Sequence, residues 1–409
     1  MIHQKRRQEL LSRLSENALV IVSSNSEQTR NSDVNYPFRP DSSFWYLTGF
    51  TEPDAIAVFS NKNYSIFVRP KDKTKEIWDG ERLGVKSAPK KLLADNAYSI
   101  DDFLKTIHKL IDKNGFVYFD ETSTNKLNEN ISSILVNAAK PLKPVISEMR
   151  LIKDSNEIQN LQTAANLAAK AHMRAMIKVS PGLHEYEIAA EIDAEFRTGN
   201  SDHAYPPIVA GGENSCILHY TENNKILNDG ELLLIDAGCE SLGYASDITR
   251  TFPINGRFSK AQKQIYQIVL SAQKSAIASI TPGEKVNTPH EIACDTISRE
   301  LTKLGIMKDQ DNLSEFYMHK TGHWLGLDVH DVGEYKIDND FRVFEEGMVT
   351  TVEPGIYIRK NDKIDSKYWN IGIRIEDDVL VTKDGHQILS KSAVKEVKDI
   401  ENLMSQNIT

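Results

Sequence analysis

The chain has 409 residues, 40% of them hydrophobic and 26% charged, and its 58 acidic and 49 basic residues give a net charge of −9. This length accommodates two or three domains with buried cores. The acidic balance argues against a nucleic-acid-binding protein, which needs a basic face. No apolar run reaches the roughly 18 residues of a membrane-spanning helix, and the first residues lack the pattern of a signal peptide. The few distant cysteines, Cys216, Cys239 and Cys294, argue against disulfides and predict a cytoplasmic protein.

Residues 1–147 alternate short apolar runs with amphipathic stretches, which is typical of an α/β domain. We expect strands at 18–22, 44–47, 55–59, 64–68 and 116–119, because these runs are β-branched or aromatic and end at turn residues. Helices are expected near 5–15 and 101–113. This region contains no glycine-rich phosphate loop. Two prolines, Pro141 and Pro144, mark a boundary, and the sequence therefore predicts a second domain over 148–409.

The second predicted domain begins with a long helix near Asp154. Asp154 and Glu157 form a capping pair, because their side chains can bind the free N–H groups of the first turn. Further helices are expected at 184–198, 259–280 and 289–304, with Ser259 as the cap of the second. Strands are expected at 348–358 and 371–382. This mixture of long helices and strands favours an α+β arrangement.

Four acidic residues stand in apolar, strand-like surroundings, where carboxylates are rare. They are Asp236, Asp247, Glu353 and Glu376. The first two are eleven residues apart, which suits adjacent strands joined by a turn at 240–244. Burial of a carboxylate costs several kcal/mol, so four in one core would require cations. Each acid alone could lie exposed at a strand end, but the four together favour a metal site.

Three of the 11 histidines lie within twelve consecutive residues: His319, His323 and His330. His319 and His323 are four residues apart, as in the zinc motif H-E-x-x-H. Lys320 replaces the glutamate of that motif, however, and Gly322 weakens a helix, so a zincin site is disfavoured. A single imidazole among oxygen donors is the better interpretation.

One imidazole and four carboxylates form a hard donor set, which favours Mn²⁺, Fe²⁺, Co²⁺ or Zn²⁺ over Cu⁺. The four negative charges would balance two divalent cations. Two ions about 3.5–4 Å apart can share a water molecule, lower its pKa and hold the oxygen of an attacked carbonyl. The sequence therefore predicts a dinuclear hydrolytic centre.

In order and spacing, the five predicted ligands resemble the metal site of the pita-bread metallopeptidases, which include methionine aminopeptidases, prolidases and aminopeptidase P. Longer segments are similar to bacterial aminopeptidase P, and the likeness covers nearly the whole chain. These segments are 30–39, 41–50, 213–222, 236–240, 243–253, 323–333, 352–357 and 372–378. The resemblance implies an α+β chain of the creatinase/prolidase type. A C-terminal pita-bread catalytic domain would follow an α/β N-terminal domain that serves oligomerisation and substrate access.

The resemblance also implies an Xaa-Pro aminopeptidase, which removes the first residue of peptides with proline in second position. It implies two metal ions, Mn²⁺ first and Co²⁺, Zn²⁺ or Fe²⁺ as alternatives, and a homodimer or homotetramer. By position, Asp236 would bind one ion, His323 and Glu353 the other, and Asp247 and Glu376 both. A hydroxide bridging the two ions would attack the scissile carbonyl, with Glu353 as general base or proton shuttle.

The same resemblance assigns roles around the substrate. His219 and His330 would stabilise the tetrahedral intermediate by hydrogen bonds. His319 would line the proline pocket, and the free amine of the substrate would bind near Asp236. Tyr335, Tyr357 and Arg374 also match family positions at this site.

Arg374 shares a predicted strand face with Glu376 and could orient that ligand, or it could pair with a surface acid. Two residues of the N-terminal domain complete the predicted site. Asp33 would meet Arg374, and Trp78 would close the pocket from the same or a neighbouring subunit. Trp78 would equally suit the core of its own domain.

One departure concerns Lys320, because relatives usually carry small residues between His319 and His323. Its cation could point to solvent or contact a substrate carboxylate, which leaves the preferred peptide length open. Prolidase, a dipeptidase with the same five ligands, is therefore the nearest alternative. A methionine aminopeptidase seldom needs such an N-terminal domain. A catalytically silent binding protein or a metal-free creatinase-like hydrolase is disfavoured because all five ligands are present.

Overall fold

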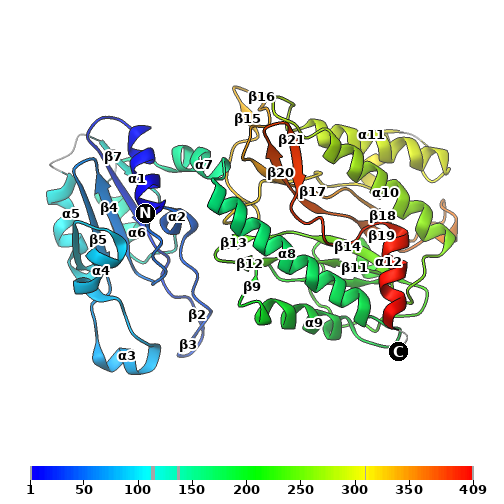
Figure 1. Ribbon diagram of the computed structural model, residues 1–409, viewed down its shortest axis with the longest axis horizontal. Coiled ribbons are helices and arrows are strands. Elements are labelled where there is room, and N and C mark those ends of the chain that lie inside the picture. Colours follow the sequence, from blue (N-terminus) through cyan, green and yellow to red (C-terminus); the bar gives the residue numbers. More distant parts are fainter. Residues whose placement is uncertain (1, 112–115, 136–138, 309, 408–409) are drawn as a thin grey trace. The chain divides into compact units, whose positions relative to one another are not determined.

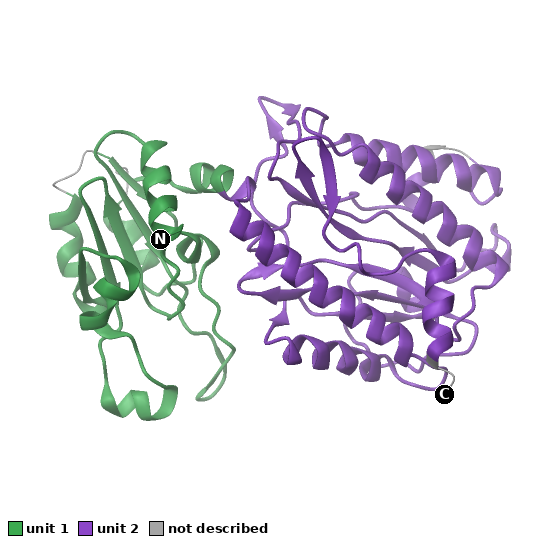
Figure 2. Cartoon of the chain, in the orientation of Figure 1, with its two compact units in different colours: residues 1–149 green, residues 150–409 purple. Residues whose placement is uncertain are grey.

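The computed structural model describes residues 2–111, 116–135, 139–308 and 310–407. The chain divides into two compact units, residues 1–149 and residues 150–409 (Figure 2). The boundary expected after residue 147 lies two residues before this division. No helix in the described ranges is long and apolar enough to cross a membrane.

A mixed six-stranded sheet forms the centre of the first unit (Figure 1). β1 pairs antiparallel with β4 and parallel with β7, so the strand order follows neither a simple meander nor a purely parallel sheet. The strands predicted at 18–22, 55–59, 64–68 and 116–119 are all present. In sheet order, the strands are β6 (Asn96–Ser99), β5 (Asn63–Val68), β4 (Ile56–Ser60), β1 (Ala18–Ser23), β7 (Phe116–Phe119) and β8 (Ala139–Pro141).

The strand predicted at 44–47 is wrong, because this run lies inside helix α2 (Ser42–Thr48). The Asp41 side chain accepts a hydrogen bond from Phe44 N at 2.8 Å and caps the helix. Gly49 ends it with a left-handed φ of 67°. Caps at both ends therefore override the strand preference of the aromatic side chains between them.

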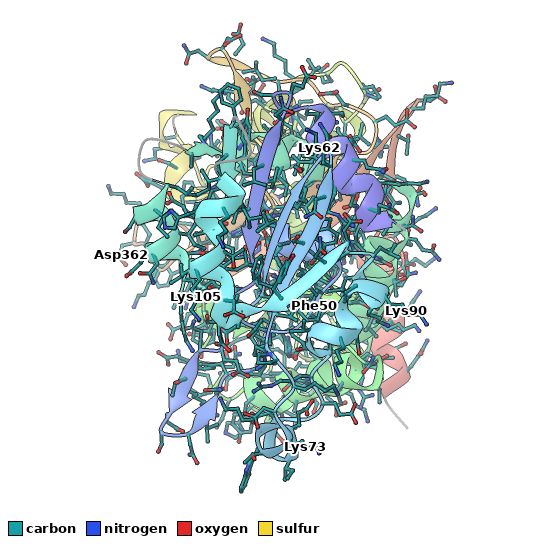
Figure 3. The ribbon with its side chains drawn as sticks, turned by 90° about the vertical axis from the view of Figure 1, so that its left-hand side faces the viewer. Phe50, Lys62, Lys73, Lys90, Lys105 and Asp362 are labelled. Atoms are coloured by element: carbon teal, nitrogen blue, oxygen red, sulfur yellow. The ribbon has the colours of Figure 1, made fainter. Side chains whose placement is uncertain are left out.

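Two helices of the first unit, α5 and α6, pack against its sheet. Phe103 and Ile107 of α5 and Ile131 of α6 join the sheet residues Ile21 and Val58 in one buried cluster. Residues 112 and 113 of the helix predicted at 101–113 lie outside the described residues. The helices are α1 (Ile2–Ser12), α3 (Lys73–Asp79), α4 (Gly84–Leu92), α5 (Phe103–Ile111), α6 (Asn128–Ile134) and α7 (Lys143–Leu151), and a hairpin joins β2 (Thr29–Asn31) to β3 (Val34–Asn35). Figure 3 shows Lys62, Lys90 and Lys105 on the outside of this unit, consistent with their exposure.

Two pairs of long helices frame the second unit (Figure 1). The Asp154–Glu157 capping box at the start of α8 is present as predicted, and so is the Ser259 cap of α10. Each box binds free N–H groups of the first turn, which fixes where its helix begins. The helices are α8 (Ser155–Lys178), α9 (Glu185–Thr198), α10 (Lys260–Ala278) and α11 (Thr288–Lys303), with the shorter α12 (Val397–Met404) near the C-terminus.

Antiparallel strands lie between these helices. One sheet consists of β10 (Ile208–Gly211), β11 (Leu232–Asp236) and β14 (Thr249–Pro253). Another consists of β17 (Val349–Val352), β20 (Asp377–Thr382) and β21 (Gly385–Ile388), and β18 (Gly355–Ile358) pairs with β19 (Ile371–Arg374). Smaller sheets contain β9 (Asp202–His203), β12 (Cys239–Ser241), β13 (Tyr244–Ala245), β15 (Lys336–Ile337) and β16 (Asp340–Phe341).

Both long strands predicted near the C-terminus are divided. The run 348–358 breaks after Val352, and its halves β17 and β18 belong to different sheets. The run 371–382 breaks in the same way between β19 and β20. Glu353 and Glu376 lie at these two breaks. Because these two residues lie between strands, their carboxylates need not be buried against the apolar face of a sheet, where an unpaired polar group is costly.

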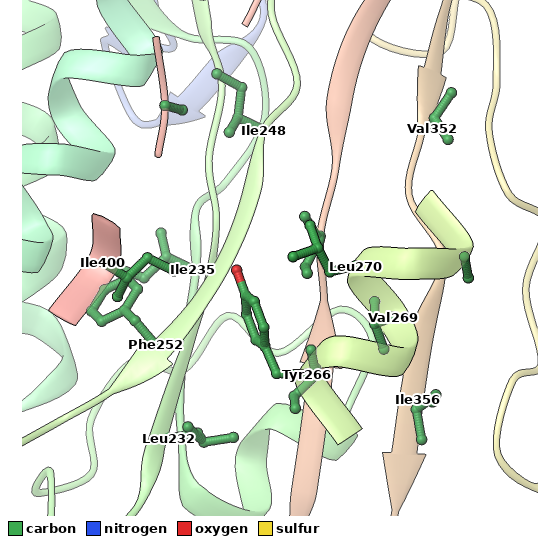
Figure 4. Close-up of a cluster of buried hydrophobic side chains, with 14 of the residues drawn as sticks. Leu232, Ile235, Ile248, Phe252, Tyr266, Val269, Leu270, Val352, Ile356 and Ile400 are labelled. Atoms are coloured by element: carbon green, nitrogen blue, oxygen red, sulfur yellow. The ribbon is translucent and has the colours of Figure 1, made fainter. Parts of the chain in front are cut away.

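Part of the core of the second unit fills the space between α10 and the sheets (Figure 4). Leu232, Ile235 and Phe252 come from the first sheet, and Tyr266 and Val269 come from α10. Tyr266 is fully buried, and its hydroxyl donates to the Lys395 carbonyl at 2.7 Å. This packing holds the two groups of strands in a fixed relation, which positions the side chains at their ends.

Candidate metal centre and active site

One cavity of about 630 Å³ in the second unit is lined by all five predicted metal ligands. Each ligand stands at the end of a strand or in the adjoining loop. Asp236 ends β11, Asp247 precedes β14, and Glu353 and Glu376 lie at the two strand breaks described above. Antiparallel pairing places Asp236 opposite Thr249, two residues after Asp247, which brings the first two acids together.

The potential ligand atoms form a tight cluster. One oxygen or nitrogen from each of Asp247, His323 and Glu376 lies within 4.8 Å of the others. His323 Nε2 lies 3.3 Å from Asp247 Oδ2 and 3.9 Å from Glu353 Oε1. Asp236 joins the cluster through the Tyr205 hydroxyl, which lies 2.6 Å from Asp236 Oδ1 and 2.5 Å from Asp247 Oδ1.

Burial and the crowding of acids shift the pKa values of several groups in this cluster. Burial and the neighbouring Asp247 and Glu353 charges raise the pKa of Glu376 well above its usual value. Burial raises the pKa of Glu353 to about 7, against the opposing charges of His323 and Arg374. Burial alone would lower the pKa of His323, but Asp247 and Glu353 raise it to about 9. Without added cations, this cluster therefore retains protons.

The donor set fits divalent metal ions. Several buried carboxylates repel each other, and two side-chain cations contact them, the protonated His323 beside Asp247 and Arg374 beside Asp236. Divalent ions would replace the retained protons and relieve this repulsion. Oxygen donors with one imidazole suit the harder first-row ions, as the sequence suggested.

Close approach of the backbone beside the ligands depends on two glycines. A Cβ at Gly322, next to His323, would lie 2.0 Å from the Thr351 carbonyl oxygen. A Cβ at Gly238 would lie 1.7 Å from the Ser246 carbonyl oxygen, next to Asp247. Both distances are too short for any side chain. Gly322 thus has a packing role that its effect on helix propensity did not indicate.

Arg374 is buried beside the ligands, which excludes the surface-pair interpretation. Its Nη2 donates to Asp236 Oδ2 at 2.5 Å, and its Nε donates to Thr249 Oγ1 at 3.1 Å. Its Nη1 donates to the Tyr357 hydroxyl at 3.0 Å. His319 Nε2 lies 2.9 Å from the same hydroxyl. A continuous chain of hydrogen bonds therefore runs from Asp236 to His319.

The remaining predicted residues of this unit line the cavity, except Tyr357, which lies buried behind His319. The rings of His330 and His323 are 4.3 Å apart between centroids. Tyr335 stacks on Trp324 at 5.2 Å, and its hydroxyl accepts a hydrogen bond from Trp324 N at 2.9 Å. His219 lies on the same cavity wall as Leu218.

The two predicted residues of the first unit are exposed. Asp33 lies in the turn between β2 and β3. Trp78 lies on α3 with 83% of its surface exposed, so its assignment to the core of its own domain is wrong. A tryptophan this exposed contributes almost no apolar burial to the stability of its domain.

Comparison with known proteins follows the same division of the chain. Residues 159–383 match metallopeptidase family M24, and residues 3–118 match the N-terminal domain of aminopeptidase P. The chain belongs to metallopeptidase family M24. The prediction of an α+β chain with a C-terminal pita-bread domain is thereby confirmed, as is that of a metal-dependent hydrolase.

Individual M24 relatives are similar over nearly their whole length. The chain is 45% identical to an Xaa-Pro aminopeptidase of Haemophilus influenzae, over 98% of this chain and 96% of that protein. The structure of aminopeptidase PepP from Pseudomonas aeruginosa matches with a TM-score of 0.94 and 41% identity, covering 100% of this chain and 99% of that one. Zinc-substituted E. coli aminopeptidase P in complex with product matches with a TM-score of 0.95 and 40% identity, covering 100% and 98%.

Three polar residues at this M24 site were missed by the sequence analysis. Tyr205 bridges two acids, as described above. Thr249 Oγ1 donates to Glu376 Oε2 at 2.6 Å. The buried Asp378 carboxylate accepts the Asp247 backbone N–H, at 3.2 and 3.3 Å to its two oxygens. Asp378 and Thr249 lie in segments that already carried the resemblance, so their polarity in strand contexts was the available signal. Tyr205 had no such signal.

A buried ionic network supports the strands behind the site. Arg250 Nη1 donates to the Glu376 carbonyl at 2.5 Å, and Arg250 Nη2 donates to Asp377 Oδ1 at 2.7 Å. The other oxygen of Asp377 accepts hydrogen bonds from Lys395 at 2.5 Å and Gln273 at 2.8 Å. Burial alone would raise the pKa of the Asp377 carboxyl, but Arg250 and Lys395 lower it below its usual value. The network thus fixes the start of β20, next to Glu376.

Proposed function

We propose that this chain is an Xaa-Pro aminopeptidase, which releases the first residue of peptides whose second residue is proline. The observation that carries the proposal is the gathering of five potential ligands and four further histidines in one cavity. Relatives named Xaa-Pro aminopeptidase, which match nearly the full length of the chain, support it. The substrates would be proline-containing peptides.

Five residues would hold two divalent ions, with Mn²⁺ as our first choice and Zn²⁺, Co²⁺ or Fe²⁺ as alternatives. Bound there, the ions would make a nucleophile from water at neutral pH and polarise the scissile carbonyl. Asp236 would bind one ion, His323 and Glu353 the other, and Asp247 and Glu376 both. The existence of a zinc-substituted relative supports the choice of a divalent first-row ion.

Glu353 is our candidate for proton transfer. Its carboxyl is half-buried on the cavity wall among the other proposed ligands, which suits a group that accepts a proton from the attacking water and returns it. His219 and His330 would donate hydrogen bonds to the oxyanion that develops on the attacked carbonyl. Burial and the neighbouring His323 lower the pKa of His330, so a neutral ring would fill this role.

The proline would lie against His319, whose ring is fixed by Tyr357 at 2.9 Å. Burial and the Arg374 charge lower the pKa of His319 to about 4, so this wall is uncharged at neutral pH. An uncharged wall suits the apolar proline ring. The peptide bond before proline lacks an N–H, so recognition by ring shape replaces backbone pairing.

Asp236 would bind the substrate amine, and Arg374 would hold Asp236 in place through its 2.5 Å hydrogen bond. Tyr335 would complete the cavity wall. For Asp33 and Trp78 we propose substrate contacts from the first unit, within a homodimer or homotetramer. We also propose that the protein works in the cytoplasm, which its three free cysteines support.

The test is metal-dependent cleavage by the purified chain, stripped of metal and reloaded with Mn²⁺. An Xaa-Pro-Yaa tripeptide should lose its first residue, while an Xaa-Pro dipeptide and a tripeptide without proline should react poorly. Preference for the dipeptide would identify a prolidase, the second candidate. Failure to cleave any of the three peptides would contradict the proposal.

A further inference from the structure

The cavity extends beyond the metal ligands to a second wall. This wall is made by the loop before α11, the first turn of α11 and the segment that follows His319. Its lining residues include Val286, Asn287, Pro289, His290, Lys320 and Thr321. The proposed reaction assigns no role to any of them.

Hydrogen bonds tie this wall to the metal centre. His290 Nδ1 lies 2.8 Å from Thr321 Oγ1, and the Tyr317 hydroxyl lies 2.5 Å from the same oxygen. The Thr321 carbonyl accepts the Glu353 backbone N–H at 2.8 Å. Thr321 is buried, so this connection is shielded from water. The position of the wall relative to the reacting atoms is therefore set by the fold.

Charge is distributed unevenly along the cavity. The four acids gather at the metal end, whereas the second wall carries the ammonium group of Lys320. Lys320 is exposed, and no ion pair with it is recorded within the described ranges. His290 bonds to Thr321, the residue that follows Lys320, so His290 and Lys320 lie on the same wall. On the same helix as His290, Glu291 accepts a hydrogen bond from Asn287 at 2.7 Å.

A peptide is itself a dipole, with an amine at one end and a carboxylate at the other. If the amine binds at the acidic end of the cavity, the rest of a short peptide extends toward the opposite charge. Lys320 follows His319, the proposed proline wall, directly in the chain. The ammonium of Lys320 is thus placed to meet a carboxylate beyond the proline.

We propose that Lys320, with His290 beside it, forms a subsite for a carboxylate on the C-terminal side of the scissile bond. The inference rests on the proposed function and narrows its substrate class to short peptides with a negative charge beyond the proline. The carboxylate comes either from the peptide C-terminus or from an acidic side chain at the third position. Both present the same group to Lys320.

The experiment compares three peptides that differ only at this charge. They are a tripeptide Xaa-Pro-Ala with a free C-terminus, the same peptide as its amide, and Xaa-Pro-Asp amide. The Mn²⁺-loaded wild-type protein should prefer the free acid over the alanine amide by about threefold to tenfold in kcat/KM, the range of a partly exposed ion pair. The difference should appear mainly in KM, because the contact is the same before and during reaction.

Variants identify the cation responsible. Lys320→Gln should remove the preference, and Lys320→Arg should largely restore it. Lys336→Gln is the matched control, because Lys336 lines the same cavity but lies 4.7 Å from the Phe341 ring on another wall. It should leave the preference unchanged. The preference should also weaken as salt is added, because an exposed charge pair is screened.

The arms separate the possible outcomes. Rescue by Xaa-Pro-Asp amide would assign the subsite to a side chain as well as a terminus, and failure of that rescue would restrict it to the terminus. Equal cleavage of free acid and alanine amide by the wild type would overturn the subsite and leave the proposed function intact. Persistence of the preference in Lys320→Gln, or its loss in Lys336→Gln, would also overturn it. If the wild type cleaves no proline peptide, the proposed function itself fails.

Discussion

Asp377→Asn tests how far the second unit depends on its buried ionic network. The Asp377 carboxylate is fully buried and binds Arg250, Lys395 and Gln273, as well as the Ser390 hydroxyl at 2.7 Å. Asparagine keeps the shape but removes the charge, which leaves two cations without their counter-charge. Removal of one partner from a buried ion pair costs about 3–5 kcal/mol. We expect this loss in the free energy of unfolding of the second unit.

The assay is urea unfolding of the metal-free protein, so that metal binding does not add to stability. Because two units need not unfold together, hydrogen exchange of peptides from 150–409 should report the transition. With a urea dependence of about 3 kcal/mol per molar, the midpoint should fall by roughly 1–1.7 M.

Two further variants test whether the effect of Asp377→Asn comes from the buried charges. Asp365→Asn removes an acid from an exposed pair with Lys367, with side chains 56% and 55% exposed, and should leave the midpoint unchanged. The double variant Asp377→Asn with Lys395→Met also removes one of the two cations that lack a counter-charge. It should recover part of the lost free energy of unfolding. If Asp377→Asn shifts the midpoint no more than Asp365→Asn does, the reasoning about buried charge is refuted.

Three other predictions concern the metal site and the core. Tyr205→Phe removes the hydroxyl shared by two acids and should raise the metal dissociation constant about 10- to 100-fold, and chelator competition that gives an unchanged constant would contradict this role. Metal loading at pH 7 should release at least about one proton per chain, because His323, with its pKa near 9, must lose its proton to bind. Calorimetry in buffers of different ionisation enthalpy measures this release, and its absence would argue against His323 as a ligand. Burial lowers the pKa of His172 to about 4, so the unfolded chain takes up a proton below pH 6.5 that the folded chain refuses. Stability should therefore fall as pH drops from 6.5 to 4, by on the order of 3 kcal/mol for this residue, and urea midpoints of His172→Gln should show a flatter dependence than the wild type.

Local rules predicted the four long helices of the second unit, α8 to α11, correctly. The capping pairs at Asp154 and Ser259 are present because they use only neighbouring residues, so sequence alone contains the necessary information. The strand predicted at 44–47 was wrong because the capping residues on either side were not taken into account. Its aromatic residues favour a strand, but the cap at Asp41 and the left-handed Gly49 decide for a helix.

The acidic ligands of the candidate site could be predicted from the sequence. The residues that contact and support these ligands could be predicted only in part. Asp236 and Glu376 are conspicuous because a carboxylate in an apolar run demands an explanation. Tyr205 gives no such signal, because nothing in the sequence around it indicates that it contacts Asp236 and Asp247. The breaks after Val352 and before Asp377 were missed because each half alone reads as a strand, and only pairing with different sheets separates them.

The strand breaks have a consequence for how the protein is made. The cluster of Asp247, His323 and Glu376 draws its members from segments spread over 247–376, and Glu376 enters from the second of the two breaks. During translation the early ligands emerge long before the last one, so a partial chain presents acids without the complete donor set. Because domains generally fold as units from the N-terminus onward, the first unit can fold while the metal site does not yet exist. Tight metal capture should therefore be a late event in biosynthesis, after synthesis has passed Glu376.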